Sequence, residues 1–340
     1  MAWMITHARG AAAGTVAAVV IGIGACGGTE LRPATTKTSP RTPTTMPAPG
    51  SSSTRAPRAS MAPHTPFAVG ITVLRFADRS RRIAGNPRIL VTVVRYPALG
   101  PPSKTDVRGA RPATPAGPFP LVVLAHGYRL APYTYTHLLR AWARAGYVVA
   151  APYFPLTNAN ARLVDRSDLI NQPQDLRFVI ARLLASGSAP LNGLIDRHRI
   201  ALAGHSDGVD SALAVAYTQR PDPRIRAAIG LSGAQIAAFT GFPSPTRGIP
   251  LLAVQGTADS VNSPSGTYNY FAAAPRPKYL LKLLGAEHTS PYQDAQPYLA
   301  IVARVSTAFL NLYVKKQRAA SHRLAEDGDV SGRSTLQSDP

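Results

Sequence analysis

The stretch G-H-S-D-G at residues 204–208 constrains the fold of this 340-residue chain more than any other. It follows an apolar run at residues 200–203 and opens an alanine-rich segment. This order predicts a strand, a tight turn and a helix, with Ser206 on the turn and its hydroxyl lifted clear of the sheet. Gly204 and Gly208 are needed there because larger side chains would collide with the neighbouring strand and helix.

Apolar runs and helical patterns alternate through the middle of the chain. The predicted buried strands lie at residues 121–124, 147–150, 200–204, 225–231, 251–254 and 279–284. Helical spacing of apolar side chains follows at 173–184 and 298–312. Continuous apolar strands separated by helices predict an α/β fold, with a mostly parallel twisted sheet and helices on both faces. An antiparallel pair at residues 69–76 and 89–96 is expected at the sheet edge.

Three polar residues are expected at the carboxyl ends of these strands. A serine hydroxyl attacks only when a base takes its proton and an acid orients that base. His288 follows the last predicted strand, and Asp259 follows the strand before it. The order Ser206, Asp259, His288 places all three at one edge of a parallel sheet. The sequence therefore predicts a catalytic Ser–His–Asp triad.

Attack by a serine also creates a negative oxygen that backbone N–H groups must hold. The predicted oxyanion donors are the N–H of Asp207, next to the nucleophile, and the N–H of Tyr128, in the loop after strand 121–124. His205, within the elbow, and His126 are interpreted as hydrogen-bonded structural residues. No cluster has metal-ligand spacing and no phosphate-binding glycine motif occurs, so neither a metal nor a cofactor is predicted.

The N-terminus is typical of an export signal. Residues 11–25 are apolar and small but too short to span a bilayer comfortably, and they end at Cys26, the only cysteine. The tetrapeptide I-G-A-C resembles a bacterial lipobox, which implies lipidation of Cys26. A signal peptide over residues 1–25 and an anchor on the extracytoplasmic face of the cell envelope are expected. An ordinary secretory signal with an incidental cysteine remains the alternative, and the protein would then be secreted.

Composition divides the rest of the chain into a linker, a catalytic domain and a tail. Residues 26–66 are rich in Thr, Pro, Ser and Ala and cannot bury a core, so an extended linker is predicted. Residues 67–314 are long enough for one catalytic domain. Residues 315–340 are polar without apolar periodicity, which predicts a disordered tail. Residues 232–248 are too short for a large helical lid.

The chain is strongly basic, with 37 Lys and Arg residues against 17 Asp and Glu and a net charge of +20. The charge is spread evenly, which favours a compositional origin, although attraction to anionic lipid headgroups or envelope polymers stays open. No nucleic-acid-binding motif is present. The predicted partners are a small-molecule or lipid ester and, through Cys26, the membrane. A monomer is expected.

Two segments, P-L-V-V-L-A-H-G-Y and R-I-A-L-A-G-H-S-D-G, resemble the α/β-hydrolase superfamily, and the resemblance covers residues 69–314. Within it they are similar to the bacterial dienelactone-hydrolase-like branch. That branch includes chlorophyllases, platelet-activating-factor acetylhydrolases and actinobacterial cutinase-like polyester hydrolases. The resemblance implies hydrolysis of carboxylic esters through an acyl-enzyme on Ser206. Dienelactone hydrolases proper carry a cysteine there, and the C-terminal disulfide of the polyester hydrolases is missing.

Two other functions remain open at this stage. A serine peptidase or amidase could use the same residues, and a panel of amide and ester leaving groups would distinguish it from an esterase. The second alternative is a lipoprotein that kept the hydrolase fold as a binding module without catalytic activity. Labelling of Ser206 by a fluorophosphonate would separate an enzyme from such a binding protein.

Overall fold

The computed structural model describes residues 66–185, 190–218, 222–233 and 248–340. The predicted signal peptide, the lipidation at Cys26 and all but the last residue of the predicted linker therefore lie outside the described residues. Most of residues 232–248, the segment predicted to be too short for a large lid, also lies outside the described residues. None of the described helices is both long and apolar enough to cross a membrane.

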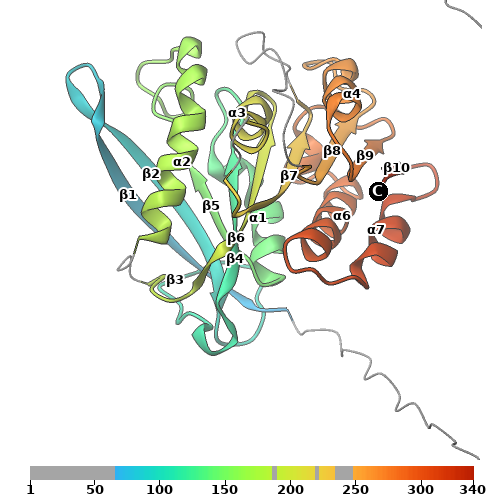
Figure 1. Ribbon diagram of the computed structural model, residues 1–340, viewed down its shortest axis with the longest axis horizontal. Helices are drawn as coiled ribbons and strands as arrows, with labels where there is room; N and C mark the ends of the chain where they lie inside the picture. The colour runs from blue at the N-terminus through green and yellow to red at the C-terminus, as the bar shows by residue number, and fades with distance from the viewer. Residues whose placement is uncertain (1–65, 186–189, 219–221, 234–247) are drawn as a thin grey trace, which may run out of the picture. The chain divides into compact units, whose positions relative to one another are not determined.

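A mostly parallel sheet forms the centre of the described residues (Figure 1). Its strands are β1 (Ala68–Ile83), β2 (Asn86–Ala98), β3 (Val107–Arg108), β4 (Phe119–Ala125), β5 (Val148–Pro152), β6 (Ile195–His205), β7 (Ile225–Leu231), β8 (Leu251–Gly256), β9 (Lys278–Leu283) and β10 (Ser334–Asp339). They lie in the order β10-β9-β8-β7-β6-β4-β5-β2-β1-β3. The six strands from β5 to β9 in this order pair in parallel. The predicted hairpin of β1 and β2 lies towards one edge and pairs antiparallel with β5.

Helices cover both faces of this sheet (Figure 1). The helices are η1 (Thr114–Ala116), η2 (Pro132–Tyr135), α1 (Thr136–Arg144), η3 (Arg166–Asn171), α2 (Gln172–Leu184), α3 (Asp207–Ala216), α4 (Pro264–Ala273), α5 (Ser290–Gln293), α6 (Tyr298–Tyr313) and α7 (Ala320–Gly328). Helices α2, α3 and α4 share one core, to which β4 contributes Leu121 and Val123. Helices α1, α5, α6 and α7 share the other, to which β4 contributes Val122 and Leu124. Alternate strand residues thus fill two cores, which is why the strands are apolar throughout. The predicted α/β architecture is confirmed.

The prediction of a disordered tail over residues 315–340 is wrong. This segment forms α7 and β10, and β10 pairs antiparallel with β9 from Ser334↔Leu283 to Asp339↔Lys278. Leu324 is buried, and Gly328 passes close beneath the side chain of Leu336. The few apolar residues of the tail are enough because backbone pairing with β9 supplies the rest of its order and covers an exposed strand edge. The folded domain therefore extends past residue 314.

The parallel strands also set where the functional loops lie. Strands β4, β6, β8 and β9 each end at the same edge of the sheet, since they run in one direction. The loops that follow them carry Tyr128, Ser206, Asp259 and His288 in turn. Residues far apart along the chain are thereby gathered at one edge.

Candidate active site

Ser206 sits on a strained turn between β6 and α3. Its φ of 54° and ψ of −128° lie in a region that residues with a side chain rarely adopt. A Cβ on Gly204 would lie 2.2 Å from the carbonyl oxygen of Gly208, and a Cβ on Gly208 would lie 2.3 Å from that of Ala125. Only glycine allows these backbones to approach so closely, so the two glycines hold the turn against β4.

The structure brings the three residues of the predicted triad into one line of hydrogen bonds. Ser206 Oγ lies 3.0 Å from His288 Nε2, and His288 Nδ1 lies 2.8 Å from Asp259 Oδ2. An ionised carboxylate can only accept, so Nδ1–H donates to Asp259 and Nε2 is left to accept the serine proton. All three residues are buried, with 7–9% of their surface exposed. This arrangement can deprotonate an alcohol and return the proton to a leaving group.

Asp259 is held by more than the imidazole. Its oxygens also accept hydrogen bonds from Val261 N–H at 3.0 Å, Asn262 N–H at 2.9 Å and Gln255 Nε2 at 3.0 Å. Burial raises the pKa of Asp259, but the bonds from His288 and the Asn262 N–H outweigh burial and lower the pKa to about 2. The carboxylate is therefore charged at neutral pH, as the orienting acid of a triad must be.

This lowered pKa predicts a contribution to acid denaturation. An unfolded aspartate has a pKa of about 3.9, so the stabilisation from Asp259 is complete above that pH and is lost as the pH falls towards about 2. We expect the thermal midpoint of the parent protein to fall further between pH 5 and pH 3 than that of Asp259→Asn, whose amide does not titrate. Calorimetry at several pH values measures this difference. Equal losses in the two proteins would contradict it.

Asn262 is a site residue that the sequence did not indicate. Its Nδ2 donates to Ser206 Oγ at 3.3 Å and to the carbonyl oxygen of Ser232 at 2.9 Å. Because Oγ already accepts from Asn262, the serine proton is directed towards His288. No motif marks Asn262, and its position depends on the turn that Asp259 stabilises.

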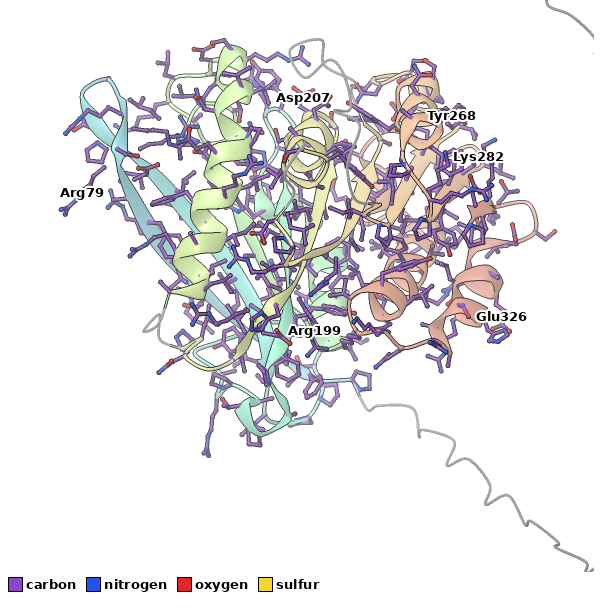
Figure 2. The ribbon with its side chains drawn as sticks, viewed as in Figure 1. Arg79, Arg199, Asp207, Tyr268, Lys282 and Glu326 are labelled. Atoms are coloured by element: carbon purple, nitrogen blue, oxygen red, sulfur yellow. The ribbon has the colours of Figure 1, made fainter. Side chains whose placement is uncertain are left out.

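The loop after β4 lies directly against the elbow. A Cβ on Gly127 would come within 2.9 Å of Ser206 Cβ. The Gly127 N–H donates to Tyr135 Oη at 3.2 Å and is therefore occupied. Within the described part of the chain, the N–H groups of Tyr128 and Asp207 have no hydrogen-bond acceptor. Asp207 is the first residue of α3 (Figure 2), where backbone N–H groups and the helix dipole favour a negative ligand.

The side chains of His205 and His126 connect the loops around the site by hydrogen bonds. His205 Nδ1 accepts from Tyr135 Oη at 2.8 Å, and His205 Nε2 donates to the carbonyl oxygen of His288 at 3.0 Å. His126 Nδ1 donates to the carbonyl oxygen of Gly127 at 2.8 Å, and its Nε2 accepts from a backbone N–H at 3.1 Å. Burial lowers the pKa of His205 to about 3 and that of His126 to about 4, so both rings are neutral. These contacts agree with a structural role for both.

The described ranges contain no group of three or more His, Cys, Asp or Glu side chains that could hold a metal ion. The site brings together a serine hydroxyl, an imidazole, a carboxylate and backbone N–H groups. A nucleophile, a base with its orienting acid and unoccupied N–H donors suit acyl transfer.

Comparisons with known proteins give one family-model match and a similar solved structure. The family model for chlorophyllase matches residues 93–233, which include β4, the elbow and Ser206. No match is found among curated proteins. A solved structure of a ferulic acid esterase from Streptomyces cinnamoneus is 24% identical, with a TM-score of 0.59, and covers 76% of this chain and 93% of its own. These matches show that the chain has the α/β-hydrolase fold of the esterase and is similar to chlorophyllases over residues 93–233.

Proposed function

We propose that this chain is a serine carboxylic-ester hydrolase that works through a covalent acyl-enzyme. The observation that carries the proposal is the unbroken line of hydrogen bonds from Asp259 through His288 to Ser206. Its supports are the strained elbow under Ser206 and the chlorophyllase and esterase matches. Among the ways of using this constellation, ester cleavage fits both comparisons.

The proposed reaction has two halves. As Ser206 Oγ attacks the ester carbonyl, His288 Nε2 takes its proton, and Asp259 stabilises the imidazolium. The N–H groups of Tyr128 and Asp207 hold the oxyanion. His288 then protonates the leaving alcohol, which departs and leaves an acyl-serine. Water, deprotonated by His288, attacks that acyl group, and collapse of the second intermediate returns the proton to Ser206 and releases the acid.

We propose accessible esters as the substrates. Leu163 and Val164 are exposed on the segment that precedes η3, and Val261 is exposed beside the turn of Asp259. Exposed apolar side chains of this kind suit short-chain or extended esters with apolar groups. A series of p-nitrophenyl esters with activity peaking at long acyl chains would contradict this part of the proposal.

The test of the reaction class uses the purified chain with a fluorophosphonate probe and matched p-nitrophenyl esters and p-nitroanilides. We expect a stoichiometric adduct on Ser206, located by peptide mass mapping, and turnover of the ester well above that of the anilide. Faster turnover of the anilide would favour a peptidase or amidase. The absence of an adduct would favour a binding protein that has the hydrolase fold without its activity.

We further propose that the enzyme is anchored to the outer face of the cell envelope through acylated Cys26. The support is the apolar segment that ends in I-G-A-C. The mass of the mature N-terminal peptide tests this proposal. A mature chain that begins elsewhere or carries no acyl group would indicate an ordinary secreted enzyme.

A further inference from the structure

A carboxylate lies where the proposed reaction would least tolerate an isolated negative charge. Asp207 follows the nucleophile directly, and only 1% of its surface is exposed. Its own backbone N–H is one of the two donors proposed for the oxyanion. A negative side chain this close to a developing negative oxygen would repel it, and burial strengthens such repulsion.

Arg166, from η3, provides the opposite charge. Its Nη2 lies 3.1 Å from Asp207 Oδ1 and its Nε lies 3.2 Å from Asp207 Oδ2. This two-point contact matches the planar guanidinium to the carboxylate. The guanidinium carbon also lies 5.3 Å from the centroid of the Tyr128 ring, within cation–π distance. One side chain thus contacts both residues whose N–H groups are proposed to hold the oxyanion.

Hydrogen bonds of the flanking residues hold the backbone of Arg166 in place. The Asp165 N–H donates to the carbonyl oxygen of Leu156 at 2.8 Å, and Asp165 caps η3 by accepting from the Ser167 N–H at 2.9 Å. Two residues after Arg166, buried Asp168 accepts two bonds from Arg88 of β2. The Arg166 side chain is 61% exposed, but the backbone on either side of this residue is anchored. It therefore reaches the elbow from a rigid segment and not from a free loop.

We propose that Arg166 is a positioning residue of the oxyanion site, which neutralises the Asp207 carboxylate and holds the side chains of Tyr128 and Asp207 in register. This inference rests on the proposed ester hydrolysis. The charge of Asp207 opposes the transition state more than the ground state, because the oxyanion exists only during reaction. Loss of Arg166 therefore lowers kcat and leaves KM nearly unchanged.

The experiment is a double-mutant cycle in the full chain with Arg166→Gln, Asp207→Asn and the two combined. Since Arg166 faces solvent, screening moderates its effect, and we expect Arg166→Gln to lower kcat by about tenfold. Asp207→Asn leaves no charge to neutralise, so we expect a smaller decrease in kcat than for Arg166→Gln. The combined variant recovers to the level of Asp207→Asn, because removing the carboxylate removes the need for the cation.

Two further variants separate charge from packing. Arg162→Gln removes an exposed arginine from the same segment, and Arg162 forms none of the ion pairs found among the described residues. It keeps the parental kcat. Arg166→Lys keeps the charge but loses the two-point contact, and it falls between the parent and Arg166→Gln. If Arg166→Gln unfolds, as judged by circular dichroism, Arg166→Lys with and without Asp207→Asn carries the same comparison.

The outcomes distinguish this inference from the proposed function. Failure of the fluorophosphonate to label Ser206 in the parent protein would reject the proposed hydrolase. Normal labelling with an unchanged kcat in Arg166→Gln would reject only the role of Arg166. A combined variant no better than Arg166→Gln would also overturn it, since a purely structural contact gives no recovery when the carboxylate is removed.

Discussion

Replacing Ser206 with alanine is expected to abolish ester turnover while the protein stays folded. The substitution removes the hydroxyl oxygen that is hydrogen-bonded to His288 Nε2 and is proposed to attack the ester carbonyl. Loss of a nucleophile in such a triad lowers kcat by about 10³-fold or more, and the remaining rate comes from binding and oxyanion contacts alone. Initial rates on a short-chain p-nitrophenyl ester, corrected for spontaneous hydrolysis, measure this loss.

The fold should tolerate that change. Alanine removes one oxygen and adds no bulk at residue 206, so we expect the thermal midpoint to stay within a few degrees of the parent, about 1 kcal/mol or less. Ser265→Ala, at an exposed serine of α4, is the matched control and keeps full activity. Undiminished hydrolysis by Ser206→Ala would show that another group performs the chemistry.

Replacing Arg88 with leucine is expected to give the largest loss of stability. Arg88 is 3% exposed and bonds Asp168 at 2.6 Å and 2.9 Å and Asp175 at 2.6 Å and 2.7 Å. Burial raises the pKa of Asp175, and its bonds to Arg88 offset only part of that effect. Removing the cation leaves buried carboxylates without their main partner, which costs about 3–5 kcal/mol. Denaturant unfolding measures the change.

A surface ion pair provides the control for this prediction. Arg224 bonds Asp222 at 2.6 Å, but both side chains are about one-third exposed, at 39% and 32%. Water and salt screen this pair, so Arg224→Leu should cost no more than about 1 kcal/mol. Similar losses from Arg88→Leu and Arg224→Leu would refute the role assigned to the buried cluster. Arg88 also anchors η3, so a stable Arg88 variant should lose part of the Arg166 contribution to kcat.

Sequence reasoning could locate the main site residues because parallel strands impose their own geometry. Once Ser206, Asp259 and His288 are each assigned to the carboxyl end of a strand, the sheet must bring them to one edge. The same reasoning could not find Asn262 or Arg166. Their contacts depend on how a turn and a short helix fold back over the elbow, and no periodic pattern encodes that path.

The C-terminal segment shows a different limit of structure prediction from sequence. Residues 315–340 contain too few apolar side chains to indicate a packed element, so polarity suggested disorder. Their order comes from hydrogen bonds with β9, which lies some 50 residues earlier in the chain. Pairing between distant strands leaves little local trace, because backbone groups are the same in every sequence. The sequence pattern therefore indicates neither α7 nor β10.

Strand β10 has a practical consequence for the truncation or tagging of this protein. The backbone N–H of Leu284, four residues before His288, donates to the carbonyl oxygen of Arg333 at 2.8 Å. Ending the polypeptide at residue 314 would remove this hydrogen bond and expose the edge of β9. The loop that carries His288 would then be less well held. Affinity handles near the carboxyl terminus, or nicking by contaminating proteases during purification, could therefore erode turnover with every reacting group still in place.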